Sequence, residues 1–250
     1  MTRTAFITGA TAGIGTAAAR RFVSEGWQVV GTGRRRDRLD ALESELGDFF
    51  HPVELDMLDT ADFGPALDAL PGRYRGIDLL LNNAGLAPPM SGLVDSDPKR
   101  NDVVIGTNVS GLVELTRALL PRLIQRKGAI INLSSVAATY PYRGGAIYAG
   151  TKAFVRQFSL GLRCDLQGTG VRVTSIEPGM VETEFTLVRT GGDQAASDAL
   201  YAKMDPMTAD DIADAIWWVA SLPPHLNINA LELMPVNQSW AGFAVHRHEG

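Results

Sequence analysis

The stretch Thr4-Ala5-Phe6-Ile7-Thr8-Gly9-Ala10-Thr11-Ala12-Gly13-Ile14-Gly15 decides the fold of this chain. Its first part, Thr4–Thr8, is apolar enough to be a buried strand, and a helical pattern begins at Gly13. The glycines are spaced Gly-x-x-x-Gly-x-Gly, which lets the backbone turn tightly and approach a pyrophosphate at a helix N-terminus. The stretch therefore predicts a dinucleotide-binding turn. The residues expected to form it are Gly9, Thr11, Ala12, Gly13, Ile14 and Gly15.

Beyond this turn, short apolar runs alternate with helical patterns along the chain. The expected strands are Thr4–Thr8, Gln28–Thr32, Phe50–Leu55, Asp78–Asn82, Gly128–Ser134, Val171–Glu177 and Asn229–Met234. The expected helices are Gly13–Glu25, Asp37–Leu46, Asp59–Leu70, Lys99–Arg126, Tyr148–Gln167 and Ala209–Ser221. Such alternation implies crossover connections and parallel strands that are buried on both faces. We predict one α/β domain over residues 1–250, a Rossmann-type doubly wound parallel sheet of about seven strands with helices on both faces.

Composition narrows the class of protein. The chain has 250 residues, 45% of them hydrophobic, and a net charge of -5, which gives no electrostatic footprint for nucleic acid. We found no continuous apolar run near the ~18 residues of a membrane span and no signal-peptide pattern. The single cysteine, Cys164, cannot form an internal disulfide. These features predict a cytoplasmic protein without a membrane or nucleic-acid partner.

Residues 180–204 do not follow the alternation. This segment comes after a strand that ends at Pro178-Gly179, and it is rich in glycine, threonine and small residues. Ligands of doubly wound sheets bind outside the carboxyl ends of the strands. We therefore expect an irregular substrate lid here rather than a plain surface loop.

Basic residues after the second strand indicate which dinucleotide binds. Proteins that bind NAD tend to place a carboxylate at the end of this strand, on the ribose 2′-hydroxyl. Here the strand meets Arg34 and Arg35, and the nearest preceding acid, Glu25, lies before the strand. Guanidinium groups would pair with a 2′-phosphate, so we predict NADP, with Arg38 as a weaker candidate.

Tyr148 and Lys152 are spaced to share one helix face, one turn apart. Bringing a phenol from its usual pKa of ~10 to neutral requires about 4 kcal/mol. An ammonium ~4 Å away at an effective dielectric of ~20 supplies about that amount. The pair could thus be an acid/base catalyst, although taken alone it could also be an ordinary surface pair.

Together these motifs resemble the short-chain dehydrogenase/reductase family over nearly the whole chain. The matching stretches are Thr8–Gly15, Asp56, Asn82-Asn83-Ala84-Gly85, Asn108, Ser135, Tyr148, Lys152 and Pro178-Gly179. The closest resemblance is to the NADP-dependent 3-hydroxy acid dehydrogenases, a group that includes serine and L-allo-threonine dehydrogenases and malonic semialdehyde reductases. It rests on Ala153–Leu160, Glu182–Arg189, Trp217-Trp218 and Asn227–Val236.

The resemblance implies roles for individual residues. Tyr148 would exchange a proton with the substrate hydroxyl. Lys152 would hold the charge of the Tyr148 phenolate and bind the nicotinamide ribose. Ser135 would position the substrate oxygen. Asn108 would distort its helix and support a proton relay to the lysine. The implied cofactor contacts beyond the turn and the arginines are Asp56, Met57, Asn83, Ala84, Gly85, Tyr148, Lys152, Pro178, Gly179, Val181 and Thr183. Asp56 could equally cap the helix that follows it.

A 3-hydroxy acid needs a partner for its carboxylate, and we expect Arg189 in the lid or Arg143 to provide it, beside Ser135 and Tyr148. The expected reaction is hydride transfer between a short 3-hydroxy acid and its 3-oxo acid or semialdehyde. Alternatives are a general carbonyl reductase for apolar substrates and a non-catalytic NADPH-binding protein. No metal site is expected, with His246 and His248 taken as exposed. The resemblance also implies a homotetramer, with the tail from Val236 near a neighbouring subunit's site.

Overall fold

The computed structural model describes residues 2–239, so the expectations for His246, His248 and most of the tail lie outside the described residues. All seven strands join one parallel sheet in the order β3-β2-β1-β4-β5-β6-β7. The strands are β1 (Thr4–Thr8), β2 (Gln28–Gly33), β3 (Phe50–Glu54), β4 (Leu79–Asn82), β5 (Ala129–Leu133), β6 (Arg172–Pro178) and β7 (Ala230–Leu233). This confirms the predicted doubly wound fold. No strand end differs from its predicted position by more than one residue.

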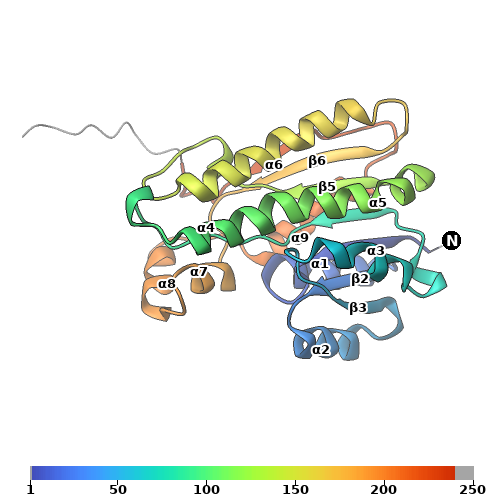
Figure 1. The fold of residues 1–250 in the computed structure, drawn as a ribbon, viewed down its shortest axis with the longest axis horizontal. Helices are drawn as coiled ribbons and strands as arrows, with labels where there is room; N and C mark the ends of the chain where they lie inside the picture. Colours follow the sequence, from blue (N-terminus) through green and yellow to red (C-terminus); the bar gives the residue numbers. More distant parts are fainter. Residues whose placement is uncertain (1, 240–250) are drawn as a thin grey trace, which may run out of the picture.

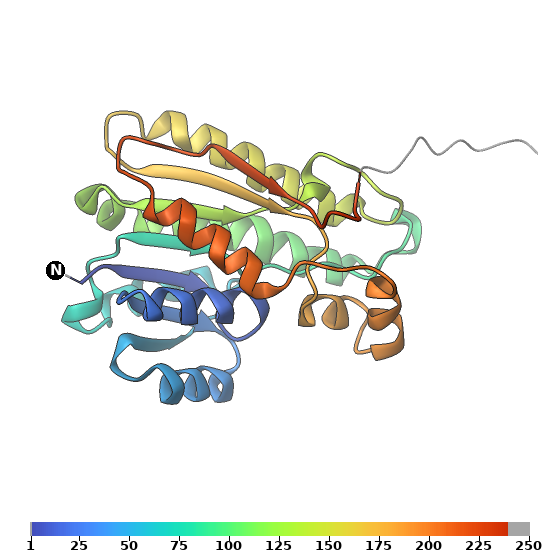
Figure 2. The ribbon, with the colours of Figure 1, turned by 180° about the vertical axis from the view of Figure 1, so that it is seen from behind.

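Helices cover both faces of the sheet (Figures 1 and 2). The α-helices are α1 (Gly13–Ser24), α2 (Arg36–Leu46), α3 (Phe63–Asp68), α4 (Pro98–Ile105), α5 (Leu112–Arg126), α6 (Ala146–Asp165), α7 (Glu184–Arg189), α8 (Gln194–Tyr201) and α9 (Ala209–Ser221). One apolar core lies between the sheet and α1, α2 and α9. A second core lies on the opposite face, under α3, α5 and α6.

The order of the strands fixes where a ligand can bind. The chain winds outward from β1 to β3, returns to β4 beside β1, and then winds the other way. The crevice of such a sheet opens at this reversal, outside the carboxyl ends of the strands. The segment with α7 and α8 lies beyond the arrowheads of the strands, at the same end of the sheet (Figure 2).

Three expected elements differ from the structure. The helix expected over Asp59–Leu70 is confined to α3, with a 3₁₀ turn before it. The helix expected over Lys99–Arg126 contains a π-helical segment, Gly106–Gly111, between α4 and α5. The segment 180–204, expected to be irregular, contains α7 and α8, whose N-termini are capped by side-chain oxygens of Thr183 and Asp193.

The helical run Pro98–Arg126 is long and apolar enough to cross a membrane by length and composition, with 44% of its most apolar window buried. This differs from our expectation, which was based on continuous apolar runs; polar residues such as Glu114 interrupt this one. Its buried side chains, Leu115, Leu119 and Leu123, pack in the core under the sheet. A core helix passes the same test, so the run is weak evidence for a membrane span.

Candidate active site

The glycine positions of the turn after β1 have little room for side chains. Gly9 and Gly13 have φ angles of 67° and 50°, in the left-handed region that glycine adopts freely. A Cβ atom on Gly15 would lie 2.2 Å from the Gly9 carbonyl oxygen. The Asn83 amide donates to the carbonyls of Thr8 (2.8 Å) and Gly9 (3.2 Å) and so ties the turn to the end of β4. The turn therefore presents bare backbone at the N-terminus of α1.

The two arginines directly after β2 contact different turns. Arg35 donates to the Thr11 hydroxyl (2.9 Å) and to the Thr11 carbonyl (3.1 Å). Arg34 is 59% exposed and lies 3.7 Å from a carboxylate oxygen of Asp56. The other oxygen of Asp56 accepts from the Leu58 N–H at 3.0 Å, so this carboxylate shapes the turn after β3. Arg35 thus lies against the glycine turn, whereas Arg34 faces the turn after β3.

Other expected cofactor residues lie at the same edge. Met57 is buried in the core, so it could meet a ligand only through its backbone. Ala84 donates its N–H to the Thr8 hydroxyl at 2.9 Å. At the end of β6, the Met180 N–H donates to the Gln238 side chain at 2.8 Å, beside Pro178 and Gly179.

Asn108 occupies the π-helical segment, where the expected distortion of the helix is present. Its amide forms two 2.8 Å hydrogen bonds with the backbone of Leu86 and donates to the Thr151 hydroxyl at 3.0 Å. These contacts join the loop after β4 to α6. Because Asn108 is 1% exposed, its amide is a fixed part of the site rather than a surface group.

Ser135 and Tyr148 come together. Ser135 follows β5, and its hydroxyl is hydrogen bonded to the Tyr148 side chain. The neighbouring Ser134 faces the other way and donates to the Lys152 carbonyl at 2.8 Å. The two serines that follow β5 therefore point in different directions, and of the two it is Ser135 that meets Tyr148.

The electrostatics of the tyrosine differ from our expectation. Burial raises the pKa of Tyr148 to about 12, although the hydrogen bond between Tyr148 and Ser135 and the charge of Arg189 oppose this. Burial also lowers the pKa of Lys152 to about 8. The Lys152 ammonium donates to the Leu133 carbonyl at 2.7 Å and lies 5.7 Å from the centre of the Tyr148 ring. The expected lowering of the tyrosine pKa by the lysine is thus absent: desolvation raises this pKa, and the charge that opposes the rise is that of Arg189.

Arg189 reaches the tyrosine from the lid. Its guanidinium carbon lies 5.7 Å from the centre of the Tyr148 ring and 5.5 Å from that of Tyr142. One nitrogen donates to the Tyr142 hydroxyl at 2.9 Å, while the buried Nε has no hydrogen-bond partner. Arg143, the second candidate, is exposed. Sequence reasoning missed Tyr142, because no spacing rule connects it to a residue 47 positions later.

The segment 180–204 is anchored where it begins and just after it ends. Val181 and Met207 form a β-bridge, and the backbone N–H of Glu182 donates to the Met207 carbonyl at 2.8 Å. Phe185 packs against Tyr148, with ring centres 5.7 Å apart. Two side chains of α7, Phe185 and Arg189, therefore lie against the ring of Tyr148.

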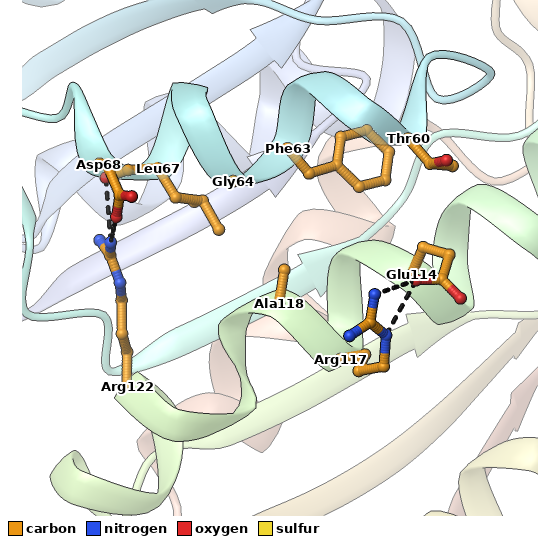
Figure 3. A pocket seen from close by; sticks show the side chains of 9 residues that line it. All are labelled: Thr60, Phe63, Gly64, Leu67, Asp68, Glu114, Arg117, Ala118 and Arg122. Atoms are coloured by element: carbon orange, nitrogen blue, oxygen red, sulfur yellow. Dashed lines mark hydrogen bonds and ion pairs between the residues drawn. The ribbon is translucent and has the colours of Figure 1, made fainter.

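A cavity of ≈300 Å³ lies elsewhere, between α3 and α5 (Figure 3). Its charged residues pair with one another, Arg117 with Glu114 and Arg122 with Asp68. None of the candidate site residues lines it, so this cavity is separate from the site. Among residues 2–239, no group of histidine, cysteine, aspartate and glutamate side chains could hold a metal ion.

Known proteins resemble this chain over most of its length. The family model for short chain dehydrogenases matches residues 3–191. A serine 3-dehydrogenase from Agrobacterium fabrum is 61% identical over 99% of both chains. A sulfoacetaldehyde reductase from Chromohalobacter salexigens is 52% identical over 98% of both chains. The NADP-dependent 3-hydroxy acid dehydrogenase YdfG from Escherichia coli K12 is 49% identical, over 96% of this chain and 98% of that protein.

Among solved structures, the closed form of a serine dehydrogenase complexed with NADP⁺ has a TM-score of 0.96 and 48% identity. The match covers 98% of this chain and 100% of that one. The glycine turn, the tyrosine–lysine helix and the π-distorted asparagine thus occur in a chain that matches its relatives from end to end. The protein belongs to the short-chain dehydrogenase/reductase family.

Proposed function

We propose that this protein is an NADP(H)-dependent oxidoreductase that interconverts a short 3-hydroxy acid and its 3-oxo acid or semialdehyde. The observation that carries the proposal is the Arg189 guanidinium, which is held 5.7 Å from the Tyr148 ring with its Nε unpartnered. A cation beside the reacting phenol favours substrates with an acid group close to the hydroxyl. The activities named for two relatives, serine 3-dehydrogenase and 3-hydroxy acid dehydrogenase, support the same substrate class.

The residues at the sheet edge fit NADP, which supplies the hydride acceptor or donor for the reacting carbon. The bare turn at Gly15 would receive the pyrophosphate, since a Cβ atom there would lie 2.2 Å from a carbonyl oxygen. Arg34 and Arg35 would hold the 2′-phosphate, because they follow the end of β2, where a carboxylate would select NAD. The relatives named with NADP support this choice.

The tyrosine would manage the proton. In reduction, the Tyr148 hydroxyl donates its proton to the carbonyl oxygen of the substrate, and in oxidation the phenolate takes it back. Ser135, hydrogen bonded to Tyr148, would hold the substrate oxygen in line. Lys152 is buried beside Gly85 and Asn108, and its charge would stabilise the phenolate. Asn108 would hold the backbone and Thr151 around that lysine.

The acid group of the substrate would bind Arg189. In serine and in 3-hydroxypropionate, a single carbon atom separates the reacting carbon from the carboxylate. Tyr142 would orient the guanidinium, because its hydroxyl accepts one N–H, while the buried Nε has no partner in the protein. A second candidate substrate class is the 2-hydroxyethyl sulfonates, in which a sulfonate takes the place of the carboxylate at the same spacing. The relative named sulfoacetaldehyde reductase supports including it.

The test uses purified protein with L-serine, 3-hydroxypropionate or 2-hydroxyethanesulfonate and either NADP or NAD, following the reduced nicotinamide. We expect rapid reduction with NADP and at least one acid, and a loss of about 10²- to 10⁴-fold in kcat for Tyr148→Phe. No reduction with any of the acids, combined with rapid reduction of apolar aldehydes by NADPH, would instead establish a general carbonyl reductase. Binding of NADPH without turnover of any substrate would leave only a regulatory role.

Arg189→Gln tests the substrate class directly. Loss of a charge-assisted contact of about 1.5–3 kcal/mol should raise KM for L-serine by about 10- to 150-fold. Arg143→Gln should change KM by less than about twofold, because that side chain is exposed. An unchanged KM in Arg189→Gln would remove the argument for an acid substrate.

We also propose that the protein is a cytoplasmic homotetramer. Support comes from the family resemblance and from partly exposed apolar side chains along α4, α5 and α6, such as Ile105, Ile124 and Phe154.

A further inference from the structure

A carboxylate of the lid binds the arginines that follow β2. Glu184, the first residue of α7, accepts from one Arg38 nitrogen through both oxygens, at 2.7 Å and 2.9 Å. It also accepts from Arg35 at 3.3 Å. Arg38 and Arg35 hold the pKa of this carboxyl below its usual value. Arg38 belongs to α2, so the contact joins two segments 146 residues apart.

The residue before Glu184 docks on the glycine turn. Thr183 caps α7, with its hydroxyl accepting from the Phe185 N–H. A Cβ atom added to Gly13 would lie 3.2 Å from the Thr183 Cβ atom, so the Thr183 side chain packs closely on the backbone of Gly13. Together with the Glu184 contacts, this attaches the start of the lid to the phosphate-binding turn.

Arg35 and Arg38 divide their contacts unequally. Two nitrogens of Arg35 donate to Thr11, and the third lies 3.3 Å from Glu184, farther than the Arg38 nitrogen. Arg38 makes its two short contacts with Glu184 and one of 3.3 Å to the Thr11 carbonyl. Arg35 therefore serves mainly the turn, and Arg38 serves mainly the lid.

We propose that Glu184 and Arg38 form a latch that holds the lid closed over the substrate, and that Arg38 is a positioning residue rather than a ligand of the 2′-phosphate. The inference rests on the proposed function, because it takes 180–204 as a substrate lid and Arg34 and Arg35 as the phosphate ligands. It adds that one arginine cluster performs two jobs. Arg34 and Arg35 would select the cofactor, and Arg38 would set the fraction of molecules in which the lid is closed.

The consequence for kinetics follows from population arithmetic. If only the closed lid binds substrate well, the apparent affinity falls in proportion to the closed fraction. Loss of the latch then raises KM, while saturating substrate still closes the lid and kcat changes little. Because the pair is half exposed, we expect a moderate effect of about three- to tenfold.

The experiment compares wild type with Glu184→Gln, Arg38→Ala and the double variant. Each single variant should raise KM for L-serine about three- to tenfold with kcat within about twofold, and the double variant should be no worse than either. The dissociation constant for NADPH should not rise in any of these three variants. Arg36→Ala is the matched control, because Arg36 lies on the same helix and pairs with Asp40 at 2.8 Å, away from the lid. It should resemble wild type.

A second measurement needs no substrate. Trypsin can cleave after Lys203, an exposed residue in the lid, when the segment opens locally. With saturating NADPH, cleavage should be about three- to tenfold faster in Glu184→Gln and Arg38→Ala than in wild type or Arg36→Ala. At about 1 M salt, where the Debye length is ~3 Å, the difference should shrink.

The outcomes separate this inference from the function it rests on. Cleavage rates and KM values equal to those of Arg36→Ala would overturn the latch. Weaker NADPH binding in Arg38→Ala, by the same factor as KM, would overturn the division of roles and make Arg38 a phosphate ligand. If wild type oxidises no hydroxy acid, the proposed function fails, but the cleavage rates still test the latch.

Discussion

At the scale of single residues, burial governs the acid/base pair. A phenol with a pKa of about 12 is fully protonated at neutral pH, so it is ready to donate a proton in reduction. Oxidation instead needs the phenolate. As long as the pH is below the pKa, the phenolate population rises tenfold for each unit by which the pH increases. The buried site therefore favours reduction at neutral pH unless other charges stabilise the phenolate.

The pH dependence tests this reasoning. We expect kcat/KM for hydroxy acid oxidation to rise with pH across about pH 6–8, while kcat/KM for reduction stays nearly flat, because Tyr148 remains protonated. Stopped-flow rates with NADP and NADPH in matched buffers would measure both. A flat oxidation profile over that range would mean that the phenolate is already formed at neutral pH.

Arg189 has a second effect that is independent of substrate binding. Its charge lowers the pKa of Tyr148, so removing that charge should raise this pKa. In Arg189→Gln, the rising limb of the oxidation profile should move to higher pH. The test uses an uncharged short alcohol as substrate, because such a substrate has no carboxylate whose contact with Arg189 could be lost. A profile identical to that of wild type would show that the guanidinium is too well solvated to act on the phenol.

At the scale of elements, local patterns predicted most of the fold. The strands and most helices follow from apolar periodicity, and the glycine turn follows from spacing. The π-helical segment could not be predicted from local patterns, because it depends on distant contacts. There, Gly111 packs so tightly on the turn after β3 that a Cβ atom would lie 2.2 Å from the Met57 carbonyl oxygen.

The lid shows the same limit. Capping residues Thr183 and Asp193 are visible in the sequence, but helices this short form mainly through tertiary contacts. The pairing of Arg189 with Tyr142 and of Glu184 with Arg38 joins segments with no common local pattern. Sequence reasoning therefore placed Arg189 in the lid but could not place the lid on the tyrosine.

The glycine turn gives a prediction at this scale. In Gly15→Ala, the Cβ atom would meet the Gly9 carbonyl oxygen at 2.2 Å and the Asn83 amide at 2.6 Å, so the turn must open. We expect NADPH binding, measured by calorimetry, to weaken by at least about tenfold. Gly64→Ala in α3 is the control, because its Cβ atom meets nothing within 4 Å. It should bind NADPH normally and unfold at the same or a higher temperature. Equal binding by both variants would contradict the pyrophosphate assignment.

At the scale of the whole molecule, apolar surface is left uncovered. The run Pro98–Arg126 is apolar enough to span a membrane, yet only 44% of its most apolar window is buried in a single chain. It lies beside α6 on one face of the sheet (Figure 1). On α6, Phe154 is 39% exposed and stacks on Phe158. A second copy of the same face would cover these side chains without any lipid.

A charge on this face tests that assembly. Four copies of the 26.8 kDa chain would have a mass of about 107 kDa, and two would have about 54 kDa. Because a carboxylate buried between copies is costly, Phe154→Glu should lower the mass measured by light scattering to one of the smaller species. Phe49→Glu is the matched control, since Phe49 is 44% exposed in the turn after α2, away from this face. If both variants keep the wild-type mass, copies do not meet through α6. If wild type is itself a monomer, the exposed apolar residues of α4, α5 and α6 must have another partner.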